Sequence, residues 1–187
     1  NPDPLAGRKI ARIAWAVYGP HTLAAEAFDP IIDGRQRDWL AFADHVSIAR
    51  AMKWLKDRVG EKRIVYKANT MIGLAEAAAG GMGMALLPCY VGAAIPGLAQ
   101  LSPPLPELEG ELWLITHPDL RNTARVRAFL DFCTGEIAQR RRLIECSDWK
   151  DQLASRSATV VGSDAGGSGD GGNGLVPATF TRRVKSQ

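Results

Sequence analysis

Cysteine and histidine are scarce in this sequence, and long apolar runs are absent from it. The 187 residues include three cysteines and three histidines, and none of them has the spacing of a zinc site or another metal site. Cys89, Cys133 and Cys146 lie far apart in the chain, which favours reduced thiols in a cytoplasmic protein. No apolar run reaches the length that a membrane span requires. We therefore expect neither a bound metal nor a membrane partner.

The sequence also lacks a strong excess of charge of either sign. It has 23 lysines and arginines against 20 aspartates and glutamates, for a net charge of +3. The one local cluster, Arg140–Arg142, is interpreted as a solvated helix end that the helix dipole favours. Neither a basic stripe nor a recognition helix is visible, so we expect no specific binding of duplex DNA by this chain itself.

Sequence signatures of catalysis are missing as well. No serine stands in a GxSxG nucleophile elbow, and the histidines form no HExxH motif. The glycines of Gly80–Gly83 superficially resemble a dinucleotide-binding loop, but they follow a predicted helix instead of opening one. We therefore predict that the chain is not an enzyme, and we expect no cofactor.

The most informative stretch runs from Ile64 to Pro88. Ile64–Tyr66 is a short β-prone run, and Asn69 and Thr70 can cap a helix that follows it. The apolar residues of this helix recur at helical spacing: Met71, Ile72, Leu74, Ala75, Ala78 and Ala79. Gly80 and Gly81 should end that helix, and the apolar run Met84–Leu87 is typical of a strand buried on both faces. The pattern is one βαβ unit, and it predicts an α/β fold.

The remaining elements are predicted from shorter signals. Expected strands cover Ile10–Tyr18, Leu98–Leu101 and Glu111–Thr116. Expected helices cover Thr22–Phe28, a stretch from Ser47 to Gly60, a short turn over Cys89–Ala94, and a long helix from Asn122 or Thr123 to Ile144. The second should bury Ile48, Ala51, Met52 and Leu55; the last should bury Val126, Phe129, Leu130, Cys133 and Ile137. Asp29–Arg37 and the proline-rich stretch 102–109 should be irregular.

The end of the chain has a different composition. The segment 162–174 reads GSDAGGSGDGGNG, which holds too little apolar surface to fold. We interpret residues 146–187 as a flexible low-complexity tail and expect mobility beyond about residue 155.

Three stretches together resemble the effector-binding domain of LysR-type transcriptional regulators. They are AGGMGMALLP at 79–88, ELWLITHPDLRNTARVRAFLDF at 111–132, and GRKIARIAWAVYGPHTLA at 7–24, and the resemblance covers roughly residues 5 to 145. It implies a two-lobed domain like type 2 periplasmic binding proteins, with one lobe nearly complete and the other partial. The implied division is 1–14 and 109–145 for the first subdomain and 15–108 for the second. The family's DNA-binding head and the first part of its first subdomain are missing from this sequence.

The resemblance also points to an effector site. In this family the corresponding helix start lines the effector cleft, which implies a site at Asn69 and Thr70. Met71 would then be a first-turn side chain in the cleft, and Tyr18, at the end of the crossover strand, is a further candidate for its lining. Helix N-termini attract anions, which predicts an effector that carries a carboxylate. The alternatives are that Asn69 or Thr70 only caps its own helix and that Tyr18 is an ordinary packed aromatic.

The function implied is small-molecule sensing coupled to transcription. A homo-oligomer is expected in the full-length protein, with DNA contacted only through the missing N-terminal domain. A fragment of a periplasmic-type solute-binding protein is the alternative, because its lobes have a similar design.

Overall fold

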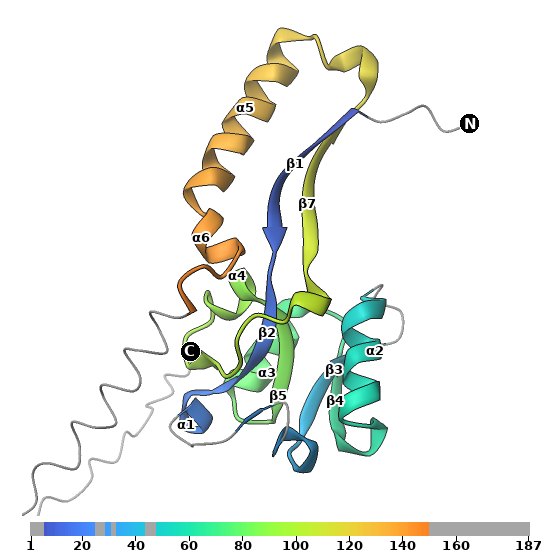
Figure 1. Ribbon diagram of the computed structural model, residues 1–187, viewed down its shortest axis with the longest axis vertical. Coiled ribbons are helices and arrows are strands. Elements are labelled where there is room, and N and C mark those ends of the chain that lie inside the picture. Colours follow the sequence, from blue (N-terminus) through green and yellow to red (C-terminus); the bar gives the residue numbers. More distant parts are fainter. Residues whose placement is uncertain (1–5, 25–28, 31–32, 44–47, 150–187) are drawn as a thin grey trace, which may run out of the picture.

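A crossover strand joins two lobes of unequal size (Figure 1). The structure, a computed structural model, describes residues 6–24, 29–30, 33–43 and 48–149. Strand β1 (Ala6–Ile13) belongs to the smaller lobe, and β2 (Trp15–Pro20) continues into the larger lobe after Ala14. The strand predicted over Ile10–Tyr18 is therefore confirmed, but it is longer at both ends and is divided between two sheets.

The larger lobe is built on a five-stranded sheet in the order β4-β3-β5-β2-β6. Its other strands are β3 (Trp39–Phe42), β4 (Ile64–Ala68), β5 (Met84–Pro88) and β6 (Leu98–Gln100). β3, β4 and β5 are parallel, whereas β2 runs antiparallel to both of its neighbours. Trp15, the first residue of β2, pairs with Pro88, the last of β5. The carboxyl ends of the three parallel strands therefore face the crossover and the smaller lobe.

The predicted βαβ unit is present with nearly the predicted limits. Helix α3 (Met71–Ala79) follows β4, and Gly81 takes the left-handed conformation, with φ of 85°, that turns the chain towards β5. Every residue of β5 is buried. Leu74, Ala75 and Ala78 of α3 pack against the sheet, but Ile72 is 65% exposed, so its assignment to the apolar face was wrong.

Short helical segments follow the strands of the larger lobe. They are α1 (His21–Ala24), α2 (Ala49–Arg58), α4 (Cys89–Gly92) and the 3-10 turns Asp33–Gln36, Glu61–Arg63 and Pro106–Leu108. Two stretches predicted to be irregular therefore contain 3-10 turns. Pro106 opens one of them because its fixed φ and missing N–H suit the first position of a helical turn. The predicted helix end at Phe28 and the cap at Ser47 lie outside the described residues.

Trp54 anchors α2 in a way that the sequence did not reveal. The helix buries Ala51, Trp54 and Leu55, and the Trp54 indole N–H donates to the Glu107 carboxylate at 2.9 Å. The Arg58 guanidinium carbon lies 4.7 Å from the centroid of the Trp54 ring, close enough for a cation–π contact. This cluster ties α2 to the segment that leaves the larger lobe.

The smaller lobe has two strands and one long helix. β1 pairs antiparallel with β7 (Gly110–Thr116), and α5 (Ala124–Gln139) packs beside them after a 3-10 turn over Pro118–Leu120. The single helix predicted to reach Ile144 breaks at Arg140, and α6 (Arg141–Ile144) follows the break. Among the described residues, no helix combines the length and the apolar character that a membrane span needs.

Much of the apolar surface of the smaller lobe is uncovered. No residue of α5 is buried, and Phe129, predicted to be buried, is 63% exposed. The other predicted core positions of this helix are only partly buried: Val126, Leu130, Cys133 and Ile137. Further exposed apolar side chains are Trp113, Ile115, Leu120 and Phe132. Apolar patches of this kind mark surfaces that another element or molecule covers.

We predict that the isolated chain associates with itself and binds a hydrophobic dye through this surface. Replacing Phe129 and Phe132 with lysine should lower dye fluorescence and shift sedimentation towards the monomer. Each change should cost less than about 0.5 kcal/mol of folding free energy, because both side chains are exposed. Ile72→Lys, an equally exposed position on α3, is the matched control and should leave association unchanged. A monomer without dye binding in the unaltered chain would contradict the prediction.

Candidate functional site

The start of α3 is a capped helix N-terminus at the carboxyl end of β4. Thr70 is the N-cap residue, and its hydroxyl oxygen accepts a hydrogen bond from the Gly73 N–H at 3.0 Å. A Cβ at position 73 would lie 2.9 Å from that oxygen, so glycine leaves the space in which the cap forms. Thr70 therefore does cap its helix, as one of the two alternatives held. The cap uses an acceptor lone pair and leaves the hydroxyl hydrogen available to a ligand.

Other donors gather at the same point. The first N–H groups of an α-helix have no partner within the helix, and here they belong to Met71 and Ile72. Asn69 and Thr70 are exposed, and Met71 is partly buried. The helix dipole adds a partial positive charge at this end. The arrangement can hold a carboxylate or a similar anion beside the cleft edge of the sheet.

Tyr18 lies elsewhere in the larger lobe. It is on β2, which is separated from β4 by β3 and β5, so the structure does not bring Tyr18 together with Asn69 and Thr70. Its side chain is 2% exposed, and its hydroxyl lies 3.1 Å from Gln100 Oε1 and 3.3 Å from the Cys89 carbonyl oxygen. A Cβ at Gly92 would lie 2.3 Å from the Tyr18 ring, so the first residues after β5 pack directly on this ring.

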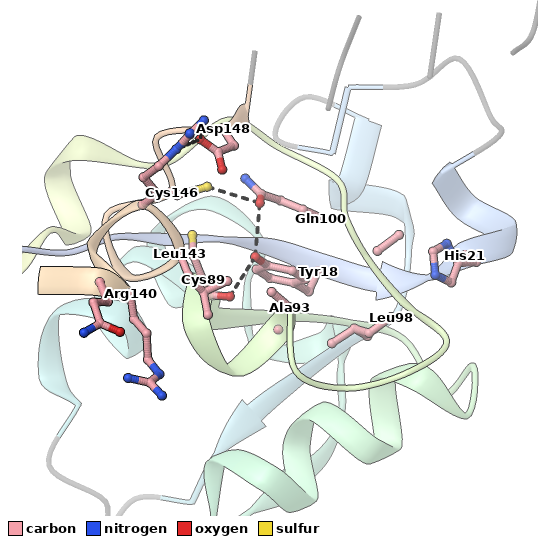
Figure 2. Close-up of a pocket in the computed structure, with 14 residues that line it drawn as sticks. Tyr18, His21, Cys89, Ala93, Leu98, Gln100, Arg140, Leu143, Cys146 and Asp148 are labelled. Atoms are coloured by element: carbon pink, nitrogen blue, oxygen red, sulfur yellow. Dashed lines mark hydrogen bonds and ion pairs between the residues drawn. The ribbon is translucent and has the colours of Figure 1, made fainter. Parts of the chain in front are cut away.

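Tyr18 lines a hollow of about 470 Å³ between α4, β6 and the segment that follows α6 (Figure 2). Gln100 and Cys146 contribute buried polar atoms, and the Cys146 thiol donates to Gln100 Oε1 at 3.3 Å. Arg142 and Asp148 form an ion pair of 2.6 Å at its rim. Cys146, at the start of the predicted tail, is thus buried, and the rest of that tail beyond Trp149 lies outside the described residues.

Sequence reasoning missed this hollow. Gln100 and Cys146 meet across 46 positions of the chain, and neither belongs to a motif. The only sequence signal near it is the basic run Arg140–Arg142, which marks a helix end and does not reveal a hollow. In the part of the chain that the structure describes, no group of histidine, cysteine, aspartate and glutamate residues could hold a metal ion.

The model of the LysR substrate binding domain matches residues 1–138. A search of curated proteins finds no match.

Several solved structures share the fold. The regulatory domain of CcmR from Synechocystis PCC6803, solved in complex with 2-PG, is 16% identical with a TM-score of 0.53, covering 72% of this chain and 68% of that one. The effector domain of AmpR from Pseudomonas aeruginosa is 19% identical with a TM-score of 0.52, and the match covers 74% of this chain and 67% of that one. The AmpR effector binding domain from Citrobacter freundii is 17% identical with a TM-score of 0.56, covering 72% and 68%. The predicted fold, two lobes of the type 2 periplasmic-binding-protein kind, is confirmed.

The contact between Gly92 and Tyr18 gives a stability test. Gly92→Ala should lower the free energy of unfolding by about 1–3 kcal/mol, because the new methyl group must displace a buried ring. Gly135→Ala is the matched control: it lies within α5 with nothing within 4 Å of the added carbon, and it should raise stability by about 0.5–1 kcal/mol. Urea unfolding measures both. Equal effects of the two changes would show that Tyr18 is not tightly packed.

Proposed function

Because this chain belongs to the family of LysR substrate binding domains, we propose that the start of α3 binds a small anionic effector and that this binding controls transcription. Membership in a family of transcription regulators favours effector sensing over the alternative of a solute-binding protein. The single observation that carries the proposed site is the Thr70-capped N-terminus of α3, which opens at the edge of the sheet that faces the smaller lobe.

The chemistry of the helix start favours a carboxylate. Its N–H groups at Met71 and Ile72 can donate to one oxygen, and the Thr70 hydroxyl can donate to the other. Charge-assisted hydrogen bonds of this kind contribute roughly 1.5–3 kcal/mol each. Asn69 is exposed beside them and can bind a further polar group of the effector. Tyr18 is a more distant candidate, which reaches the effector only if the ligand extends towards the hollow of Figure 2.

The signal would pass through the relative position of the two lobes. A ligand that binds one arrangement more tightly shifts the population towards it. In the full-length protein, a homo-oligomer would then present its DNA-binding domains differently, and DNA would be contacted only through those domains. Such a regulator works in the cytoplasm, where the DNA is. We propose no catalytic step, because binding alone supplies the free energy of the switch.

Thr70→Val tests the site. Valine keeps the shape of the side chain and removes the hydroxyl, so effector affinity should fall by about tenfold or more. A panel of small mono- and dicarboxylic acids, screened against the full-length regulator by thermal shift, supplies the effector, and calorimetry measures its affinity. The lost cap should also lower the free energy of unfolding by about 1 kcal/mol.

Two matched variants separate binding from capping. Thr70→Ser keeps a hydroxyl and should keep most of both affinity and stability. Thr123 is the N-cap residue of α5 but makes no side-chain cap hydrogen bond, so Thr123→Val should change neither quantity. If Thr70→Val loses stability with unchanged affinity, Thr70 is only a cap and the proposed site is wrong. If no carboxylic acid binds, the proposed effector class is wrong.

A further inference from the structure

We propose that Cys89 and Cys146 form a redox-active dithiol, which a small hydroperoxide oxidises to a disulfide that fastens the junction between the two lobes. The chemistry of the pair stands independently of the effector site. Its regulatory consequence rests on the proposed movement of the lobes.

The two thiols come from distant parts of the chain and meet at one hollow. Cys89 opens α4, directly after β5, whereas Cys146 follows α6, which lies against α4 where the smaller lobe meets the larger one. Both line the hollow of about 470 Å³, and Figure 2 shows their sulfur atoms on the same side of Tyr18 and Gln100. The Cys146 thiol donates to Gln100 Oε1 at 3.3 Å, and the Cys89 carbonyl lies 3.3 Å from the Tyr18 hydroxyl. This network holds both cysteine residues in place.

The backbone at Cys146 supports a special role for this residue. Its φ is 52°, and it is the one residue other than glycine with positive φ in the described part of the chain. Residues with a Cβ adopt this conformation at a cost, and they keep it where the surrounding structure demands it. The turn after α6 thereby directs the Cys146 side chain towards Gln100 and Cys89.

The environment makes Cys146 the nucleophile of the pair. The hydrogen bond from the Cys89 thiol is the main cause that lowers the pKa of Cys146 to about 7, against burial and the nearby Asp148 carboxylate. The Cys89 thiol has a strongly raised pKa, because it donates to Cys146 and is buried. Near neutral pH, Cys146 is therefore partly thiolate while Cys89 keeps its proton.

The chemistry needs only a hydroperoxide as oxidant. The Cys146 thiolate attacks the terminal oxygen of the peroxide, an S–O bond forms, the O–O bond breaks, and the leaving alkoxide or hydroxide takes a proton from water. The Cys89 sulfur then attacks the Cys146 sulfur. An S–S bond forms, the S–O bond breaks, and hydroxide leaves with the Cys89 proton as water. Two thiols are oxidised, and one peroxide is reduced to an alcohol or water.

The position of the pair explains what a disulfide would change. Ala14, the residue between β1 and β2, accepts a hydrogen bond from the Cys89 N–H at 2.9 Å and donates one to the Ile144 carbonyl at 3.1 Å. Cys146 is two residues beyond Ile144. A covalent link from Cys89 to Cys146 would therefore enclose the lobe junction and hold α6 against α4. Oxidation would fix one lobe arrangement, whatever effector is present.

Peptide mapping of the purified chain tests the proposal directly. Trypsin cuts after lysine and arginine, so Cys89, Cys133 and Cys146 fall in separate peptides, residues 68–121, 128–140 and 143–150. After hydrogen peroxide treatment and alkylation of the remaining thiols, non-reducing mass spectrometry should show peptide 68–121 linked to peptide 143–150, with two hydrogens lost. Cys133, on α5, should remain alkylated. Thiol loss should be about tenfold faster at pH 8 than at pH 6, following the thiolate fraction of Cys146.

Variants and outcomes make the test decisive. Cys133→Ser is the matched control and should leave the link intact, whereas Cys146→Ser should abolish it. A link that involves Cys133, or sulfinic acid at Cys146 without a link, would overturn the proposal, as would three unreacted thiols. The mapping on the unaltered chain decides this even if Cys146→Ser fails to fold. If no disulfide forms between Cys89 and Cys146, the proposed effector site at Thr70 is not affected. If Thr70→Val leaves effector affinity unchanged, the proposed dithiol is not affected.

Discussion

The backbone N–H and C=O groups of Ala14 determine how the two lobes meet. Its N–H donates to Ile144 and its carbonyl accepts from Cys89, so one residue holds the end of the smaller lobe and the start of α4 together. Both bonds are made by the backbone, and Ala14 is 6% exposed. A buried backbone group that lost either partner would carry the cost of an unmade hydrogen bond, about 1–3 kcal/mol. Any movement of the lobes must keep or replace these two bonds. Cys89 and Cys146 lie beside this junction, and the start of α3 lies at the edge of the sheet that faces the smaller lobe.

Local signals carried the parts of the fold that were predictable. In the stretch Ile64–Pro88, a cap, a helical period, two glycines and an apolar run each refer to residues close in the chain, and the structure contains strand, helix and strand there. The start of α3 belongs to that same unit, so its residues could be named from the sequence. Whether these residues bind an effector depends also on the structure of the ligand, and local sequence signals carry no information about it.

The remaining features depend on partners far away in the sequence. Trp54 is fixed by Glu107, 53 positions later, and Cys146 by Gln100, 46 positions earlier. The exposure of the Ile72 and Phe129 side chains could not be predicted. A helical period shows that one face of a helix is apolar, but it does not show whether another element covers that face. We attribute the break between α5 and α6 at Arg140 to the docking of α6 near Ala14, which is likewise a long-range contact.

The larger lobe begins and ends at the same place, because the Leu105 N–H donates to the Trp15 carbonyl at 2.8 Å. The smaller lobe is assembled from segments on either side of it, with Ala6 opposite Thr116. The larger lobe is thus an insertion within the smaller one. During synthesis its residues emerge consecutively and can pack before β7 exists. Once folded, it holds the ends of the interrupted lobe close together, so that pairing β1 with β7 no longer requires the closure of a long flexible loop.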